Sequence, residues 1–321
     1  MGFARASVIA ALLVSMAAGA QAQATFPDKP IRLIIGSAPG SGPDIIARVL
    51  AERLWKAWGH RIVVDSRPGA AGTISAEITM RAAPDGYTWM ILTSQLLIAS
   101  AVYPNVKFDL QRDFASIALI GTVPFVLMVN PQLPAKSVAE LIDLAKKSPG
   151  TLRYGSAGTG GGEHLTAVLF THMAGINMLH VPYKGIPQAV ADTISRELHA
   201  VFAVFPVAYP QVQSARLRGL GITTKARSPL LPDVPPISAT VPGYDTYGWY
   251  SVVAPMGTPA AILEKVSAEV VKAVREPEFT EQLKGLGIDL SPGGRAELDA
   301  FRRDQTKRFV DLVKVAGAEL K

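Results

Sequence analysis

The sequence predicts an α/β fold with two lobes, and three observations lead to this class. Segments typical of strands and of helices alternate along the chain, as expected for helices packed on sheets of largely parallel strands. The 321 residues exceed the usual size of a single hydrophobic core. The segments 122–125 and 248–253 are expected to cross between the lobes. We therefore expect 25–123 plus 250–321 to form one domain and 124–249 the other.

The first part of the chain alternates three expected strands with two expected helices. Apolar runs bounded by turn residues predict strands at 31–35, 61–64 and 87–93. Apolar residues at helical spacing predict helices over 44–58 and 73–83. This order of elements is typical of an α/β lobe.

The rest of the chain continues the alternation and ends in amphipathic helices. The motif Ser137-x-x-Glu140 is a capping box, which predicts that a helix begins there. A strand is expected to end near Val181. The other expected strands are 117–122, 125–129, 152–154, 198–205, 217–222 and 249–254, and the expected helices are 137–147, 163–173, 187–196 and most of 262–321.

Two glycine-rich turns, 38–44 and 154–164, each follow a strand-like run and open a helix. The start of a helix leaves backbone N–H groups unpaired and carries the positive end of the helix dipole, so it attracts anions. Two such turns facing one cleft would bind a small anion, and two lobes joined by two crossings can close around it. The motif Ser41-x-x-Asp44 resembles a capping box at the first of these helix starts.

The N-terminus is typical of a secretory signal peptide covering residues 1–24. Arg5 precedes the apolar run 6–16, and two overlapping Ala-x-Ala sites predict cleavage after Ala22 or Ala24. We therefore expect an exported protein. The chain has no cysteine, which excludes a disulfide framework and a lipoprotein attachment site.

The charge pattern argues against nucleic acid as a partner. The net charge is +6, but Lys and Arg are spread along the chain without a dense basic run. The five histidines lack the spacing of a metal site, so we expect neither a metal nor another cofactor. The positive balance modestly favours anionic ligands.

Short motifs rich in proline and glycine recur along the chain after the expected cleavage site. They include Phe26-Pro27-Asp28-Lys29-Pro30, Ala38-Pro39-Gly40, Arg67-Pro68-Gly69-Ala70-x-Gly72, Pro84-Asp85-Gly86-Tyr87-Thr88, His180-Val181-Pro182-Tyr183-Lys184-Gly185 and Leu231-Pro232-Asp233-Val234-Pro235. In this order they resemble Bug-type extracytoplasmic receptors, the substrate-binding proteins of tripartite tricarboxylate transporters. The resemblance covers essentially the whole mature chain.

This resemblance implies a periplasmic-binding-protein fold of a type II-like kind, with two crossing strands at the hinge. It implies a monomer without catalytic activity that captures a small carboxylate and delivers it to a membrane permease. In the family the carboxylates are held largely by backbone N–H groups, hydroxyls and waters. The candidate ligand-binding residues are Ser37, Pro39, Gly40, Ser41, Gly42, Asp44, Thr93, Ser94, Ser156, Gly158, Thr159, Gly160, Gly161, His164, Lys184 and Phe205.

Three departures from the family pattern bear on the ligand. Ser41 adds a hydroxyl where the family usually has glycine, and the segment 94–101 lacks the usual Asn-Pro. Glu163 places a carboxylate in the second glycine-rich turn, where it would repel an anion unless it points away, or would meet an amine or a ligand hydroxyl. These departures make citrate itself a poor default for the ligand.

Several candidates have simpler structural roles, and two other functions stay open. Asp44 is expected mainly to cap its helix, Lys184 can equally be a surface charge, and Phe205 can belong to the core. The chain could hand its ligand-bound form to a signalling partner instead of a permease. A hydrolase using Ser156 and His164 is the contrasting hypothesis, although the chain has no Gly-x-Ser-x-Gly motif.

Overall fold

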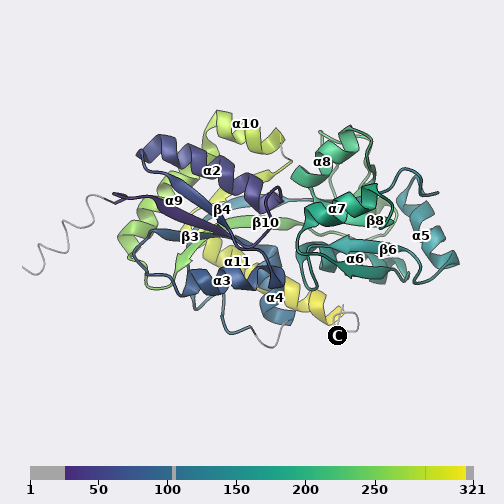
Figure 1. Ribbon diagram of the computed structural model, residues 1–321, viewed down its shortest axis with the longest axis horizontal. Helices are drawn as coiled ribbons and strands as arrows, with labels where there is room; N and C mark the ends of the chain where they lie inside the picture. The colour runs from purple at the N-terminus through teal and green to yellow at the C-terminus, as the bar shows by residue number, and fades with distance from the viewer. Residues whose placement is uncertain (1–25, 103–105, 286, 316–321) are drawn as a thin grey trace, which may run out of the picture.

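The computed structural model describes residues 26–102, 106–285 and 287–315 and shows two lobes side by side (Figure 1). The expected signal peptide, 1–24, lies outside the described residues. Within the described ranges, no helix combines the length and the apolar character that crossing a membrane requires.

The first lobe is built on a six-stranded sheet in the order β11-β4-β10-β3-β1-β2. Both faces are covered, with α2 and α10 on one side and α3 and α4 on the other (Figure 1). Leu33 and Ile34, adjacent on β1, accordingly belong to two different buried clusters. The elements are β1 (Ile31–Ile35), α2 (Gly42–Trp58), β2 (Ile62–Ser66), the 3-10 turn η1 (Ala70–Gly72), α3 (Thr73–Met80), β3 (Thr88–Thr93), α4 (Ser94–Val102), β4 (Phe114–Val123), β10 (Gly248–Pro255), α9 (Ala260–Arg275), α10 (Pro277–Gly285), β11 (Asp289–Gly293) and α11 (Arg295–Val315).

The second lobe is built on a five-stranded sheet in the order β7-β6-β8-β5-β9. Its central strands β5 and β8 are buried along their whole length, which explains their continuous apolar sequences. The elements are β5 (Phe125–Val129), α5 (Val138–Lys147), β6 (Arg153–Ser156), α6 (Gly162–Ala174), β7 (Leu179–Pro182), α7 (Ile186–Ile194), β8 (Ala200–Val204), α8 (Phe205–Gln213), β9 (Arg218–Ile222) and the 3-10 turn η2 (Ile237–Ala239).

Most strands of each sheet run in one direction, as expected, but both sheets are mixed because β5, β10 and β11 run the other way. β1 runs parallel to β2 and β3, and β6 runs parallel to β7 and β8. In contrast, β10 runs antiparallel to β3 and β4, and β5 runs antiparallel to β8 and β9. Within each lobe, most strands that are connected by helices run in one direction. β5 and β10 run the other way because each of them enters its sheet from the other lobe.

The two crossings lie next to each other and are bonded together. β4 ends at Val123 and β5 begins at Phe125, whose backbone N–H donates to the buried Thr223 hydroxyl at 2.9 Å. On the return, Gly248 pairs with Val123 and Trp249 with Thr122 in the six-stranded sheet. Gly248 and Trp249 therefore belong to the first sheet, although the predicted boundary assigned them to the second domain. The division into two domains otherwise stays a prediction.

The lobes also touch through a ring and a glycine. The expected strand 198–205 ends at Val204, and Phe205 begins α8, where its ring stacks on Tyr209 with centroids 5.6 Å apart. The Phe205 ring lies against Gly287 of the first lobe, so closely that a Cβ at residue 287 would overlap it. Gly287 also has φ of 71°, which favours glycine. Phe205 is thus a core residue at the contact between the lobes.

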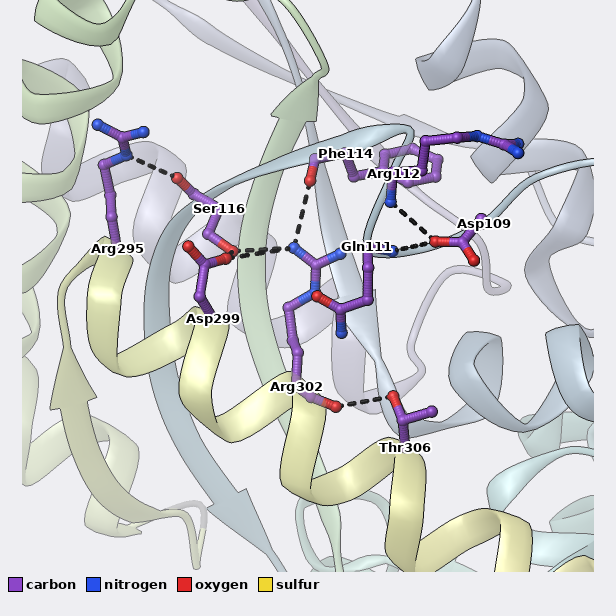
Figure 2. A network of polar contacts seen from close by, with 9 residues as sticks. All are labelled: Asp109, Gln111, Arg112, Phe114, Ser116, Arg295, Asp299, Arg302 and Thr306. Atoms are coloured by element: carbon purple, nitrogen blue, oxygen red, sulfur yellow. Dashed lines mark hydrogen bonds and ion pairs between the residues drawn. The ribbon is translucent and has the colours of Figure 1, made fainter.

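Helix α11 is fixed to β4 by a buried arginine (Figure 2). Arg302 is 1% exposed and donates to the Ser116 hydroxyl at 2.9 Å and to the Phe114 carbonyl at 3.3 Å. The same hydroxyl donates to Asp299 at 2.5 Å. Burial lowers the pKa of Arg302 to about 10, and its Nε and Nη2 atoms have no hydrogen-bond partner in the part of the chain that the structure describes.

Candidate functional site

A cavity of about 220 Å³ lies between the two lobes. Its walls follow the carboxyl ends of strands in both sheets, where α/β folds commonly bind ligands. In the first lobe these are Gly36 after β1 and Thr93 at the end of β3, and in the second Ala157 after β6 and Val204 at the end of β8.

Several helices begin at this cavity. α2 contributes Ser41 and Gly42, and α4 contributes Ser94 and Gln95. From the other lobe, Glu163 lies in the first turn of α6, and α7 begins with Gly185 and Ile186. Helix starts from both lobes therefore direct the positive ends of their dipoles into one space.

The lobes approach each other at the rim of the cavity. Gly185 faces the Ala38 side chain, since a Cβ on this glycine would lie 2.8 Å from that of Ala38. Gly161 likewise faces Gln95 of the first lobe, whose Nε2 would lie 3.2 Å from a Cβ at residue 161. The glycines of the second lobe thus allow close contact between the lobes.

The first glycine-rich turn partly satisfies its own donors. The Asp44 carboxylate accepts from the Gly40 backbone N–H at 2.9 Å and pairs with Arg48, also at 2.9 Å. Ser41 is the N-cap residue, yet its hydroxyl makes no capping bond and donates to the Ser37 hydroxyl at 2.9 Å. The expected capping box is therefore not formed, because the acid accepts from the Gly40 N–H instead of the Ser41 N–H and the serine hydroxyl turns toward Ser37.

The second glycine-rich turn holds a stack of two neutral histidines. The Gly160 backbone N–H donates to His164 Nδ1 at 2.9 Å, so the ring proton of His164 lies on Nε2. The His164 ring stacks on His180 with centroids 3.8 Å apart, and His180 Nε2 lies 2.7 Å from the Ser156 hydroxyl. Burial lowers the pKa of His164 to about 3 and that of His180 to about 4. The stack is therefore uncharged at neutral pH and supports the turn from behind.

Three residues that line the cavity, Glu163, Trp249 and Tyr250, each carry a buried polar atom without a hydrogen-bond partner among the described residues. Glu163, on α6, is 7% exposed, and its Oε2 makes no hydrogen bond. Burial, opposed only by the residue's own backbone N–H, raises its pKa to about 7. Tyr250, on β10, is 2% exposed and its hydroxyl is also unpartnered. Burial and the nearby Glu163 raise the pKa of Tyr250 well above its usual range.

The Tyr250 hydroxyl lies against the start of α2. A Cβ at Gly42 would overlap this hydroxyl and lie 2.8 Å from a Val204 methyl group. Because residue 42 is a glycine, the start of α2, β10 of the first sheet and the end of β8 of the second sheet can meet at one wall of the cavity.

The structure brings half of the sequence-predicted site residues to the cavity. The residues in its wall are Ser37, Ser41, Gly42, Thr93, Ser94, Gly158, Thr159 and Lys184. Those outside the wall are Pro39, Gly40, Asp44, Ser156, Gly160, Gly161, His164 and Phe205. Most of the second set lies one layer deeper, where the residues satisfy one another. Ligand contact by the first set stays a prediction.

A family model described as the tripartite tricarboxylate transporter family receptor matches residues 46–318. The chain belongs to this family. Among curated relatives of the receptor, the protein BugT of Bordetella pertussis is 30% identical over 300 residues, which cover 92% of each chain. A protein from the tcbD-tcbE intergenic region of Pseudomonas sp. is 33% identical over 307 residues, covering 95% of the receptor and 91% of the relative.

Solved structures share the receptor's fold over nearly its whole length. The structure of R. palustris Rpa4515 with adipate is 32% identical, with a TM-score of 0.89, and covers 91% of the receptor and 98% of that chain. The periplasmic binding protein BugD is 27% identical, with a TM-score of 0.87, and covers 91% and 99%. The predicted family and two-lobed α/β fold class are confirmed, and the receptor is a solute-binding protein.

The geometry does not support the contrasting hypothesis of a hydrolase that pairs Ser156 with His164. Ser156 is fully buried, and its hydroxyl lies beside His180 instead. It also bonds to the backbone of Gly158, so its oxygen is not open to the cavity. Within the described ranges, no group of three His, Cys, Asp or Glu side chains could hold a metal ion.

Sequence reasoning missed the residues that reach the cavity from distant segments. Trp249 and Tyr250 come from the returning hinge strand, Phe125 from the outgoing one, and Gln95 from a helix that was not expected. Tyr183 lies within a motif that did carry the resemblance. The sequence signal that could have placed Tyr250 at the cleft is its position in the segment 248–253, which was expected to cross between the lobes.

Proposed function

We propose that this receptor binds a small organic acid as its carboxylate in the cavity between the lobes. The observation that carries the proposal is the convergence of the starts of α2, α4, α6 and α7 on one space of about 220 Å³. Each helix start contributes about 0.3–1 kcal/mol to the binding of a negative charge. Lys184 and the hydroxyls of Ser37 and Thr93 add a cation and further donors to the wall.

The relatives support a carboxylate as the ligand class. Rpa4515, at 32% identity, is described with adipate, which is a dicarboxylate. The family works with tripartite transporters, so we propose that the receptor is exported to the periplasm, acts as a monomer and delivers its ligand to the permease of such a transporter. We propose no catalytic step, since Ser156 and His164 lie behind the wall.

Thermal unfolding with a panel of mono-, di- and tricarboxylates and aromatic acids tests this function. An acid at one hundred times its Kd is expected to raise the free energy of unfolding by about 2.7 kcal/mol. Ala157→Trp, which fills the cavity from a loop position, should abolish this stabilisation. Ala268→Trp, on an exposed part of α9, is the matched control and should retain it. The proposal is wrong if no acid stabilises the receptor, or if both variants respond equally.

A further inference from the structure

We propose that Glu163 takes up a proton when a carboxylate enters the cavity, and that its protonated carboxyl group then donates a hydrogen bond to the ligand. The inference rests on the proposed function and deepens it, because it makes the binding of the acid depend on a proton.

Two of the unpartnered polar atoms, Glu163 Oε2 and the Tyr250 hydroxyl, are available to a ligand that binds between the lobes. Glu163 Oε2 and the Tyr250 hydroxyl belong to different lobes, are both more than nine-tenths buried and both line the cavity. A buried polar atom without a partner costs about 1–3 kcal/mol. A polar group of a ligand that binds between the lobes is the partner that Glu163 Oε2 lacks.

The charges around Glu163 do not hold its carboxyl group in the ionised form. Besides Glu163, the titratable groups in the cavity wall are Tyr183, Lys184 and Tyr250. Burial and Asp192 raise the pKa of Tyr183 to about 12, so both tyrosines are neutral. Lys184 makes no resolved contribution to the pKa of Glu163, which burial alone raises. The cavity therefore supplies no cation that holds Glu163 ionised.

The elements packed against α6 do not supply one either. The neighbouring His164 is neutral and directs Nδ1 to the Gly160 N–H. α4 carries no ionisable side chain, and its Ser94 and Gln95 are neutral donors. α11 also contacts α6, but its buried Arg302 donates to Phe114 and Ser116 of β4. Among the described side chains, no charge contributes to the shifted pKa of Glu163.

A bound carboxylate shifts the protonation equilibrium of Glu163. In the free receptor the pKa of Glu163 is about 7. A ligand carboxylate in the same water-poor space disfavours a second negative charge, so it raises that pKa further. The proton comes from the solvent and binds Oε2, which then becomes a donor. The Tyr250 hydroxyl is a second donor, so protonated Glu163 and Tyr250 both offer O–H groups to a carboxylate.

A ligand ammonium group would have the opposite effect. It would stabilise the ionised form of Glu163, lower its pKa and release a proton on binding. The sign of the proton exchange therefore separates acids held by a protonated Glu163 from amino acids held by an ionised one.

The experiment measures Kd by calorimetry at pH 6 and pH 8 for adipate, succinate, citrate and benzoate, with glutamate as the ammonium-bearing comparison. For the wild-type receptor, a free pKa of about 7 predicts that binding weakens about tenfold between these pH values. Titrations near pH 7 in two buffers of different ionisation enthalpy should show proton uptake. Glu163→Gln keeps the shape and a donor, so it should remove the pH dependence and bind about tenfold more tightly than wild type at pH 8.

The matched control is Glu281→Gln, which makes the same change on the exposed surface of α10; it should keep the wild-type pH dependence. Binding of an acid with equal Kd at both pH values, or with proton release, overturns the inference and leaves the proposed function standing. Weaker binding by Glu163→Gln at both pH values also overturns it. If no acid of the panel binds wild type at either pH, the proposed function fails and this inference fails with it.

Discussion

Replacing Glu163 by glutamine should change the pH dependence of folding even without a ligand. The pKa of this carboxyl group rises from 4.5 to about 7 in the folded receptor because burial disfavours the charge. The folded state therefore holds a proton that the unfolded state releases between these pH values. Stability from this group is fully present below pH 4.5 and is lost as the pH rises through 7. At about 1.36 kcal/mol for each pH unit, the total loss is about 3 kcal/mol.

Urea unfolding of wild type and Glu163→Gln at pH 5, 6, 7 and 8 measures this loss. The difference between the two proteins should grow with pH and approach about 3 kcal/mol at pH 8, with the variant the more stable. The buried His164 and His180 lose stability in the opposite direction, toward acid, because burial lowers their pKa values. Both proteins contain these histidines, so their effect cancels in the difference. A constant difference across this range would refute the reasoning, and Glu281→Gln, on the surface, should show no trend.

Three further substitutions test other parts of the structure. Gly287→Ala should lower the free energy of unfolding by more than about 1 kcal/mol, because it adds a Cβ at φ of 71° against the Phe205 ring. The control is Gly285→Ala, where no atom lies within 4 Å of the added Cβ. Equal thermal stability of the two variants would contradict the contact between the lobes. Arg302→Ala should cost about 2–4 kcal/mol in urea unfolding, because it empties a buried site between α11 and β4, whereas Arg303→Ala, which is exposed, should stay within about 0.5 kcal/mol. Lys184→Met should weaken the binding of an acid severalfold and reduce its dependence on salt, as measured by calorimetry at two ionic strengths. An unchanged Kd would show that Lys184 does not contribute to the site. The control is Lys146→Met, on the exposed face of α5, which should bind as wild type does.

Local patterns predicted the elements whose signals are local. The strand 31–35 and the helix start at Ser137 agree with the structure, where the Ser137 hydroxyl accepts from the Glu140 N–H at 3.2 Å. The same motif at Ser41 misled, because Ser37 and Gly40 offered its side chains other partners. Capping at a helix start therefore depends on the preceding loop as well as on the motif.

Other features depend on contacts that no local pattern contains. α4 was not expected, because its sequence is apolar on all sides and its first residues lack a capping pattern. Tyr250 and Glu163 share one cavity although 87 residues separate them in the sequence. The glycine-rich turn 154–164 was expected to present free donors, but His164 from its own helix already accepts from Gly160. Only the folded arrangement shows which donors remain for a ligand.

The construction of the cavity wall has a consequence for how this receptor can diverge. Main-chain N–H groups at helix starts survive nearly every substitution, so the general attraction for anions persists as the sequence drifts. The ionisable side chains that line the cavity in the described part of the chain are few: Glu163, Tyr183, Lys184 and Tyr250. Gene duplicates could therefore acquire new preferences by single replacements at these positions while keeping the same architecture. Relatives that share about a third of their residues and nearly all of their fold agree with this route.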